Sequence, residues 1–439
     1  MQIDLKRSYL MHKPKLCITV FRNNLRINDN LALNEASKCC ENMISLYSLE
    51  LLKGTNLGFN KCGEFRKQFI YESLIDLKKN LLKKNIWLYI VDDIEKTLEI
   101  LNEDYDLRVF FEKEIGVEEK EFEKKLEKYK GKSFFNQTML EPFEFDYKKS
   151  FSHFRKKAEK MTINEPVKVI DSKDKLFMCI KIEEINLSLD ENKRVLKGGE
   201  TDALNRVDEY LSKHLHTYYD TRSLVDGFNN STKFSPYLAS GCISAKTLYY
   251  KIKEYENKLG VSKSSYWIFF ELLWRDFFHL VMLQSGNKLF LKEGLSYKVY
   301  KFSENKDKLE LFFNAKTGVD IIDAGIIELK KTGWISNRQR QLLSSYFIKN
   351  LGLDFRYCAA FFEEYLLDFS PASNYGNFAY QSGVGNDKQY RVFDPVKQSS
   401  FYGGKEYVKK WLEKEETLPD FDYKQMALDV KEKIYKIKD

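Results

Sequence analysis

Three apolar or glycine-containing segments carry polar side chains suited to binding. In YWIFFELLWRDFFHLVM, residues 266–282, Glu271 and Arg275 are four residues apart, with Trp274 on the same side of a helix. A carboxylate and an indole on one face can line a pocket. An ion pair between Glu271 and Arg275 inside a core helix explains the spacing equally well, so the sequence leaves both interpretations open.

Two further segments place amides and arginines near glycines. TGWISNRQRQ, residues 332–341, follows a helix that ends at its glycine, and DFSPASNYGNFAYQSGVGND, residues 368–387, shows no period. The second is expected to be a long ordered loop, which is uncommon between helices unless it serves a site. The polar residues of interest in the two segments are Asn337, Arg338, Arg340, Gln341, Asp368 and Asn374.

A run of hydroxyl groups precedes a proline and a predicted helix in NNSTKFSPYLASG, residues 229–241. Hydroxyls and backbone amides at the start of a helix can hold a phosphate, whereas an ordinary helix cap is the simpler explanation for such a run by itself. The residues concerned are Ser231, Thr232, Lys233, Phe234 and Ser235.

Composition predicts a folded chain of more than one domain. The 439 residues are 43% hydrophobic and carry a net charge of +7, which excludes a disordered chain. Gly (21) and Pro (7) are scarce, so a largely helical or mixed fold is expected. The charge suits a polyanionic partner, but a solvated lysine-rich surface explains it more simply.

The cysteines and the start of the chain bear on the cellular environment. The seven cysteines form no Cys-x-x-Cys and no Cys/His set at zinc spacing, so neither a disulfide framework nor a structural metal is expected. No secretory signal and no apolar run of the ~20 residues needed to cross a bilayer is present. We therefore expect a soluble protein of a reducing compartment such as the cytoplasm, with no membrane association.

Hydrophobic periodicity predicts two domains. Residues 1–140 alternate short apolar strands with helices such as Phe65–Leu82 and Val117–Tyr129, which indicates an α/β domain with a parallel, Rossmann-like sheet. Residues 141–199 are expected to be an interdomain linker, basic between 148 and 168, and residues 200–439 an all-α domain. The predicted strands are Leu16–Phe21, Met43–Tyr47, Ile86–Val91, Arg108–Phe111 and Ser133–Phe135; the predicted helices of the second domain are Ala203–Leu215, Ala245–Tyr255, Tyr266–Met282, Ile321–Leu329, Arg338–Asn350 and Ala359–Leu367.

These motifs together resemble the photolyase/cryptochrome family. The resemblance covers nearly the whole chain, through FRNNLRINDN and KCGEFRKQFIYESLIDLKKNL, then GGETDAL, STKFSPYLASGCIS, YWIFFELLWRDFF, TGWISNRQRQ and SNYGNFAYQSGVGND. It is strongest to the DASH-type branch, which includes single-strand-directed cyclobutane-dimer photolyases. The resemblance implies an α/β antenna domain followed by a helical FAD-binding catalytic domain.

The resemblance implies specific residues for FAD and for DNA. Asn374 would face the flavin N5, and Arg340 would pair with Asp368 beside the ring; Tyr218, Arg222 and the run from Ser231 to Ser235 would hold the diphosphate. Arg222 would also meet DNA phosphates, and a monomer acting on pyrimidine dimers, single-stranded DNA preferred, is implied. The residues assigned to catalysis or to the lesion and its phosphates are Glu271, Trp274, Asn337, Asn374, Arg338, Gln341, Tyr380 and Arg391.

An antenna folate, 5,10-methenyltetrahydrofolate, is also implied. Lys113 and Glu114, followed by Glu118 and Glu119, resemble the folate edge of DASH-type members, while a solvated acidic helix start explains them equally well. The (6-4) enzymes of the family have His where this chain has Asn337 and Gln341, so their His-assisted chemistry is not expected here.

The chain departs from the family at several positions. The three tryptophans that relay electrons to the flavin in most relatives are matched by Phe312, Phe355 and Phe378, so photoreduction of FAD is expected to be slow or to use Tyr375 or Tyr380. Ser370 stands where relatives usually have Asp near the ring.

The leading function is therefore light-driven, FAD-dependent dimer repair. A blue-light photoreceptor that signals through a partner or through nucleic acid is the alternative, and a flavoprotein that binds nucleic acid without repair is a third. Sensory members usually carry a long tail, whereas 28 charged, helix-like residues follow Trp411 here, which favours repair.

Overall fold

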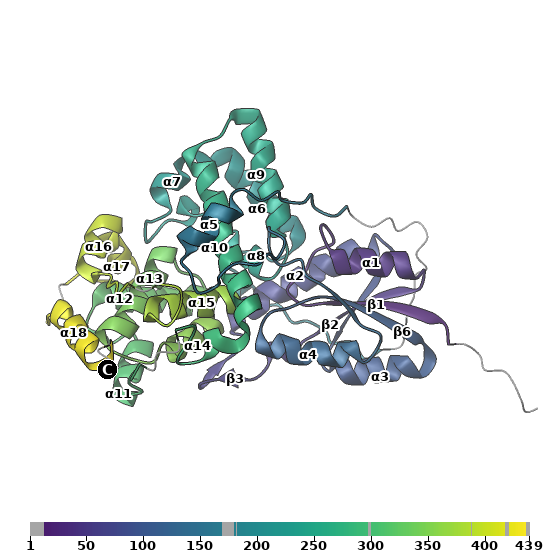
Figure 1. Ribbon diagram of the computed structural model, residues 1–439, viewed down its shortest axis with the longest axis horizontal. Coiled ribbons are helices and arrows are strands. Elements are labelled where there is room, and N and C mark those ends of the chain that lie inside the picture. The colour runs from purple at the N-terminus through teal and green to yellow at the C-terminus, as the bar shows by residue number, and fades with distance from the viewer. Residues whose placement is uncertain are drawn as a thin grey trace, which may run out of the picture.

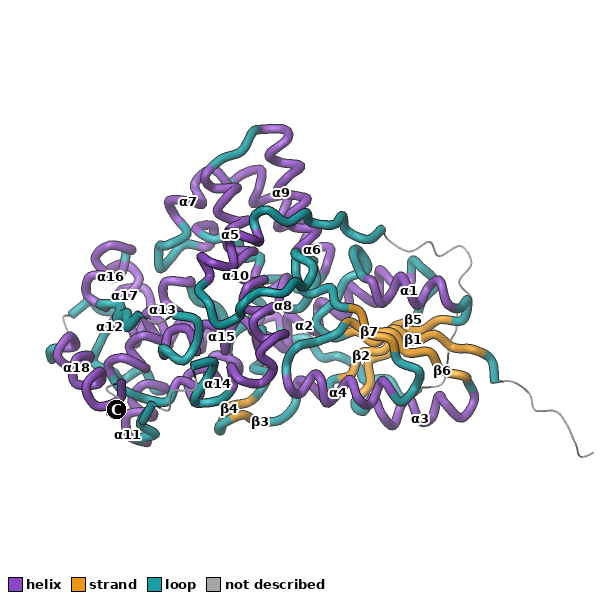
Figure 2. Tube along the Cα trace, in the orientation of Figure 1, coloured by secondary structure: helices purple, strands orange, loops and turns teal. Residues whose placement is uncertain are grey.

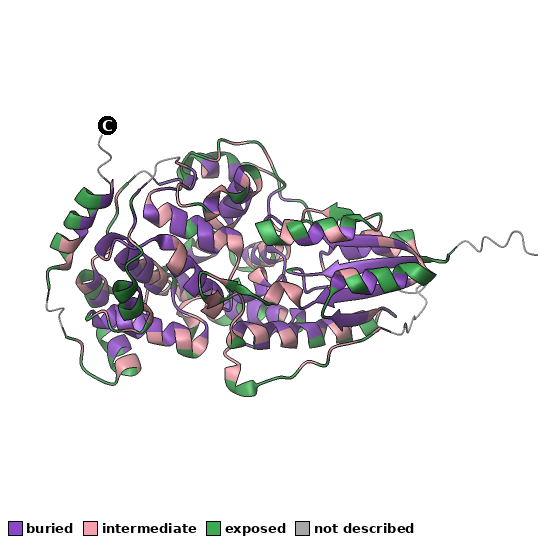
Figure 3. Ribbon diagram, turned by 90° about the horizontal axis from the view of Figure 1, so that it is seen from below, coloured by how far each residue is buried: buried purple, intermediate pink, exposed green. Residues whose placement is uncertain are grey.

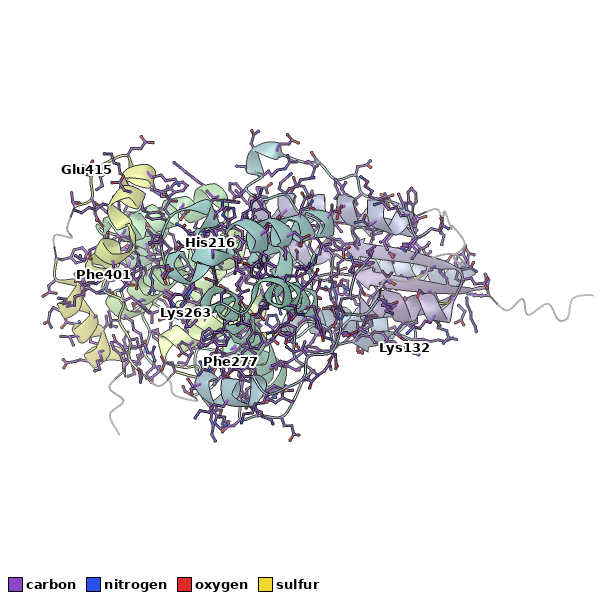
Figure 4. The ribbon with its side chains drawn as sticks, turned by 90° about the horizontal axis from the view of Figure 1, so that it is seen from above. Lys132, His216, Lys263, Phe277, Phe401 and Glu415 are labelled. Atoms are coloured by element: carbon purple, nitrogen blue, oxygen red, sulfur yellow. A yellow bond between two sulfur atoms is a disulfide. The ribbon has the colours of Figure 1, made fainter. Side chains whose placement is uncertain are left out.

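A computed structural model describes residues 13–168, 180, 182–296, 300–387, 389–417 and 421–435. An α/β part lies at one end of the elongated molecule and a helical part at the other (Figure 1). Figure 4 labels Lys132 beside the sheet and Phe277 in the helical part. The predicted combination of a parallel-sheet domain with an all-α domain is confirmed.

The α/β part contains a five-stranded parallel sheet in the order β5-β2-β1-β6-β7 (Figure 2). Its strands match the five apolar runs because strands buried on both faces read as continuous hydrophobic stretches. Register pairs Ile18 with Ile44 and with Val109. The strands are β1 Lys15–Phe21, β2 Met43–Ser48, β5 Trp87–Val91, β6 Asp106–Glu112 and β7 Lys132–Phe134.

Helices cover both faces of this sheet, and side chains alternate between two cores. Leu16, Ile18 and Val20 point into a core with Phe122 and Leu126 of the covering helix α4. On the other face, residues such as Phe21 belong to a core that continues without interruption into the helical part. The four strands other than β7 are accordingly largely buried, while the outer helix faces are exposed (Figure 3). The helices of this part are α1 Leu31–Cys39, α2 Glu64–Leu82, α3 Ile94–Asp104 and α4 Val117–Glu127, and a hairpin is formed by β3 Thr55–Asn56 and β4 Phe59–Asn60.

The helical part is built around α10, Lys263–Ser285, which is apolar on most of its surface and contacts α5, α7, α9 and α15. All six helices predicted for this domain exist; the predicted helix Arg338–Asn350 begins as α13 and continues as one π-helical turn, Tyr346–Asn350. The remaining helices are α5 Phe151–Ala158, α6 Glu200–Lys213, α7 Tyr218–Thr221, α8 Ser235–Ala239, α9 Ala245–Leu259, α11 Lys306–Phe313, α12 Asp320–Thr332, α13 Asn337–Ser345, α14 Phe355–Tyr365, α15 Pro371–Ser382, α16 Pro395–Tyr402, α17 Gly404–Leu412 and α18 Tyr423–Val430; short turns of 3-10 helix are Glu50–Leu52, Glu191–Lys193, Leu215–Thr217, Phe228–Asn230 and Gly286–Phe290, and a second π-helical turn is Lys431–Tyr435.

The expected loop at residues 368–387 is wrong, because α15 occupies Pro371–Ser382. Pro371 starts the helix at a position where its missing N–H costs nothing. The helix packs on α10 through a small residue: a Cβ on Gly376 would lie 2.4 Å from Cδ1 of Phe278. Because the buried face of this helix contains small and polar residues, its sequence shows no apolar residues at helical spacing.

The expectation that cysteines form no disulfide is also wrong. Cys17, in β1, and Cys40, which caps α1, are joined by a disulfide with their Cα atoms 5.9 Å apart. Their spacing in the sequence is not a recognisable motif. The two cysteines meet only because the chain, after β1 and α1, returns to the end of the sheet where β1 begins. Within the described ranges, no helix has the length and hydropathy needed to cross a membrane.

Candidate functional site

Two adjoining cavities, of about 570 and 250 Å³, lie in the helical part between α8, α10, α13 and α15. They share walls formed by Asn337, Arg340, Gln341 and Asp368. Every residue that the sequence assigned to FAD or to the lesion lines one or both of them. The outer cavity is lined by Glu271, Trp274 and Tyr380, and the inner one by Lys233 and Asn374.

Glu271 in the outer cavity forms an ion pair with Arg222 of the segment after α7, with Oε1 and Nη1 3.1 Å apart. Its side chain is 38% accessible, from within the cavity. Burial by the surrounding protein nevertheless raises the pKa of the carboxyl, and the nearby Arg222 opposes this. The ion pair between Glu271 and Arg275 is not formed: Arg275 instead donates to the backbone oxygen of Gln137. The pocket interpretation of this helix is therefore the one that the geometry supports.

Aromatic rings of the outer cavity are held by a layer of other rings. Trp274 stacks on Phe151 of α5, with centroids 3.7 Å apart and an angle of 11° between the planes. Tyr380 meets the same indole edge-on at 5.8 Å. The supporting Phe151 was missed from the sequence because it lies in the stretch interpreted as a linker, although its position beside the basic residues of α5 was visible.

Lys233 in the inner cavity is a buried amine without a carboxylate partner. It is 4% exposed, its Nζ donates to the Ser231 hydroxyl at 2.8 Å, and it lies 3.5 Å from the centroid of the Trp334 ring. Burial, together with the positive charges of Arg206 and Arg340, lowers the pKa of Lys233 to about 7. In the part of the chain that the structure describes, no carboxylate lies within ion-pairing distance of this amine. Trp334, which supports the amine, was not identified from the sequence.

This arrangement fits a diphosphate. Arg222 and Arg338 each have a buried Nε without a hydrogen-bond partner among the described residues, and both guanidinium groups line the outer cavity. Ser231 and Ser235 add hydroxyls at the start of α8. Guanidinium N–H groups without a partner, together with hydroxyls, are satisfied by phosphate oxygens, so the donor set fits the FAD that the sequence implies.

Arg340 and Asp368 form the expected pair, with Nη1 and Oδ1 2.9 Å apart. The Asp368 side chain is almost completely buried, and Arg340 also donates to the Ile335 carbonyl. Nearby, the Asn374 amide donates to the Ala359 carbonyl at 2.9 Å, which leaves its carbonyl oxygen toward the inner cavity available as an acceptor. The two groups give the inner cavity a fixed ion pair and a neutral acceptor.

Two arginines flank the outer cavity. Arg338 donates to Gln341 Oε1 at 3.0 Å and lies over the ring of Tyr402, while Arg391 pairs with Asp387 at 3.1 Å and is more than half exposed. Arg391 is therefore the more accessible of the two charges.

Glu114 lines neither of these cavities but a small space of about 30 Å³, which shares Arg275 with the outer cavity and Ser370 with both. It is buried and accepts hydrogen bonds from Asn23 and Gln137, so a solvated acidic helix start does not describe it. Burial raises its pKa. Glu118 and Glu119 line a neighbouring groove of about 80 Å³ between the two parts of the molecule, together with Arg66 and with Lys61, which pairs with Glu118 at 2.6 Å.

The three phenylalanines at the electron-relay positions are buried, and Phe378 lines the inner cavity. Their ring neighbours are other phenylalanines: Phe362 for Phe378, Phe302 for Phe355 and Phe347 for Phe312. Beside them, the buried Tyr375 donates to Glu363 at 3.2 Å. Burial raises the pKa of this carboxyl.

Comparison with known proteins agrees with this geometry. Residues 17–171 match the DNA photolyase family model, and residues 267–436 match the FAD binding domain of DNA photolyase. A chloroplastic/mitochondrial cryptochrome DASH of Arabidopsis thaliana is 37% identical over 91% of this chain and 76% of its own. A cryptochrome DASH of Synechocystis is 32% identical over 93% and 90%.

Solved structures show the same fold. The crystal structure of a Synechocystis cryptochrome matches with a TM-score of 0.88 at 29% identity, covering 96% of this chain and 99% of that one. A class III photolyase from Agrobacterium tumefaciens, at 22% identity, has the same fold with a TM-score of 0.80, covering 97% and 98%. With its FAD binding domain and its cryptochrome DASH relatives, the chain belongs to the photolyase/cryptochrome family.

Proposed function

We propose that this protein repairs cyclobutane pyrimidine dimers with light, acting on single-stranded or looped DNA. The observation that carries the proposal is the wall shared by the two cavities, because one set of residues would then contact both FAD and the lesion. When bound and reduced, FAD supplies the electron that light transfers to the dimer and that returns after the cyclobutane ring opens, so no net redox change results.

The inner cavity and the residues around it would hold FAD. Lys233, Ser231, Thr232 and Ser235 at the start of α8 would bind the diphosphate together with Tyr218, Phe234 and Arg222. Arg340 and Asp368 would flank the flavin ring, where their fixed pair presents a guanidinium and leaves no free carboxylate. Asn374 would accept a hydrogen bond from the flavin while staying neutral.

The outer cavity would hold the lesion. Trp274 and Tyr380 meet at a right angle and would clasp the two bases through their apolar faces. Glu271, Asn337 and Gln341 supply a carboxylate and two amides for the polar edges of the bases. Arg338 and Arg391 would meet the flanking phosphates, which makes binding dependent on salt.

A dimer reaches such a cavity only after it leaves the base stack. Extrusion costs least where the strand is already unpaired, which supports a preference for single-stranded or looped DNA. The cavity of about 570 Å³ is large enough for two joined bases.

An antenna folate would occupy the interdomain groove at Glu118 and Glu119. Glu114, held rigidly at the adjacent corner, would anchor the polar edge of the pterin. Glu118 and Glu119 line neither cavity of the helical part, although their groove shares Ala239 with the outer one and Phe369 with the inner one, so their replacement would change light collection and leave FAD binding intact.

Illumination of the reduced, FAD-loaded protein with thymine-dimer oligonucleotides tests the proposal. We expect restored absorbance at the thymine band and separable repaired strands, faster with single-stranded than with double-stranded substrate. Trp274→Ala, with FAD retained, serves as the matched control and should repair little. Retention of all dimers in both substrates would overturn the proposal and leave a blue-light receptor or a nucleic-acid-binding flavoprotein.

A further inference from the structure

Three cysteines meet at one edge of the α/β part, far along the chain from the cavities. The sulfur atoms of Cys17, Cys39 and Cys40 all lie within 4.8 Å of one another. Cys17 and Cys40 are joined, and Cys39 is a free, exposed thiol. The cluster therefore places a thiol within reach of a disulfide.

The three sulfurs differ in access to solvent. Cys17 is completely buried in β1, Cys40 is partly exposed, and Cys39 is exposed at the last residue of α1. The backbone N–H of Cys17 donates to the Asn42 carbonyl at 3.0 Å. This hydrogen bond holds β1 against the turn that follows Cys39 and Cys40. A small thiol in solution can thus reach the disulfide from the Cys40 side but not from the Cys17 side.

We propose that Cys17, Cys39 and Cys40 form a thiol–disulfide exchange site that low-molecular-weight thiols open and close. A thiolate from solution attacks the Cys40 sulfur, the bond to Cys17 breaks, and Cys17 leaves as a thiolate that takes a proton. A second thiol releases Cys40, so two thiol molecules are oxidised to one disulfide while the protein gains two thiols. Oxidised low-molecular-weight disulfide reverses the sequence.

Cys39 adds an internal exchange to this site. Its thiolate attacks the Cys17 sulfur, forms a Cys17–Cys39 bond and releases Cys40, with no net redox change. The other exchange, a bond between Cys39 and Cys40, is disfavoured because neighbouring Cα atoms lie about 3.8 Å apart, below the usual disulfide range. Cys17 is therefore the fixed partner, and the two adjacent cysteines compete for it.

The loop closed by this bond carries contacts to the helical part. Between Cys17 and Cys40, the backbone N–H groups of Ile27 and Asn28 each donate to Glu200 at 2.9 Å. Arg26 donates to the Gly241 carbonyl at 3.1 Å. When the disulfide opens, the segment between Cys17 and Cys40 loses a covalent restraint. The contacts that this segment makes with the helical part then depend on the redox state of the cysteines.

Peptide mapping of the full-length, FAD-loaded protein tests this proposal. The protein is equilibrated in glutathione buffers from reducing to oxidising, the thiols are blocked, and tryptic peptides are analysed without reduction. Cleavage beside Lys15, Arg22 and Lys38 separates Cys17 from the peptide that holds Cys39 and Cys40. We expect the linked pair to appear in oxidising buffer and disappear from native protein in reducing buffer, with a melting temperature a few degrees lower and faster hydrogen exchange in residues 22–30.

Cysteine variants distinguish exchange from an inert structural bond. Cys40→Ser should form a Cys17–Cys39 disulfide. Cys17→Ser should leave both Cys39 and Cys40 as thiols. Cys62→Ser is the matched control and should keep the wild-type disulfide pattern. A Cys17 thiol that stays free in oxidising buffer, or a bond that opens only after denaturation, would overturn the proposal. If Cys40→Ser does not fold, the fragment ions that separate the two isomers in the wild-type protein decide the same point: absence of the Cys17–Cys39 isomer counts against exchange.

Discussion

At the scale of single residues, the most informative group is Lys233. An isolated lysine amine has a pKa of about 10.4, and this one is lowered to about 7 by burial and by Arg206 and Arg340. The main-chain φ of Lys233 is +58°, in the left-handed region, so the local backbone is also strained. A buried amine that has no carboxylate partner among the described residues and lies in a strained turn is typical of a site whose anion arrives with a ligand.

Binding of FAD should therefore be coupled to proton uptake. A diphosphate beside Lys233 favours the charged amine and raises its pKa, so at pH 8, where the free site is mostly neutral, binding takes up a proton. Affinity is highest below pH 7 and falls as the pH rises above that value, by at most about tenfold per unit. Calorimetry of FAD binding to apoprotein in two buffers of different ionisation enthalpy measures the uptake. It should vanish in Lys233→Met and persist in the exposed Lys331→Met; an uptake unchanged in Lys233→Met contradicts the assignment.

Glu271 should contribute to DNA affinity but not to FAD binding. Glu271→Gln keeps the size of the side chain and removes the charge that pairs with Arg222. Loss of a hydrogen bond to a charged group costs about 1.5 kcal/mol, which corresponds to roughly tenfold weaker binding of a dimer oligonucleotide. Fluorescence anisotropy in the dark measures this, with the exposed Glu254→Gln as control. Equal affinities for both variants and wild type would place Glu271 outside the lesion site.

At the scale of elements, α15 shows how packing decides what periodicity cannot. Its buried residues include Ala372, Gly376 and Ala379, while Asn374, Asn377 and Phe378 line the inner cavity. Asn374 is placed in the inner cavity because α15 lies directly against α10. The helix α5 is a second example. It lies in residues 141–199, which were predicted to be a linker, and its Phe151 stacks on the indole of Trp274.

Gly376→Ala should loosen this contact. The added Cβ would lie 2.4 Å from the Phe278 ring, so α10 and α15 must move apart. Overpacking of this kind costs about 1–3 kcal/mol, which exceeds the gain of up to about 1 kcal/mol in helix propensity. We expect a lower free energy of unfolding and reduced FAD occupancy, measured by urea titration and flavin absorbance. Lys331→Ala, at an exposed position of α12 outside both cavities, should change stability by less than about 0.5 kcal/mol. Greater stability of Gly376→Ala would contradict the close approach.

At the scale of the whole molecule, the three positions that the family resemblance assigns to an electron relay are occupied by buried phenylalanines. Phenyl rings are far harder to oxidise than indoles, so Phe312, Phe355 and Phe378 cannot relay electrons as tryptophans do. Tyr375, three residues before Phe378 on α15, is an oxidisable group whose proton can pass to Glu363, while Asn56 donates to both. Tyr380 is the alternative on the outer-cavity side.

Photoreduction of oxidised FAD should therefore be slow and tyrosine-dependent. Under blue light with excess thiol, we expect Tyr375→Phe to lower the rate of FAD photoreduction further. If the electron comes from the outer-cavity side, Tyr380→Phe lowers this rate instead. Replacing Phe312, Phe355 and Phe378 by Trp together should accelerate it. Flavin absorbance follows the reduction, and a tyrosyl signal in paramagnetic resonance reports the donor. A fast wild-type rate, unaffected by Tyr375→Phe and Tyr380→Phe, would contradict both routes.

By itself, the sequence determined the strands of the sheet, several of the helices and which residue types could meet. Continuous apolar runs indicated the five parallel strands, and apolar residues at helical spacing indicated six helices of the second domain, because burial leaves a periodic mark along the chain. The polar residues of four short motifs identified the cavity walls for the same reason: each interrupts an apolar or small-residue surface.

Only the tertiary structure decided how those residues pair. In the fold, Glu271 forms its ion pair with Arg222 and not with Arg275. The Lys233 amine lies over the Trp334 ring, and Cys17 forms a disulfide with Cys40. Each of these contacts joins elements that are separated along the chain, and their distance is set by how helices and strands stack. Local periodicity records whether a side chain is buried, but not which partner from another element it meets.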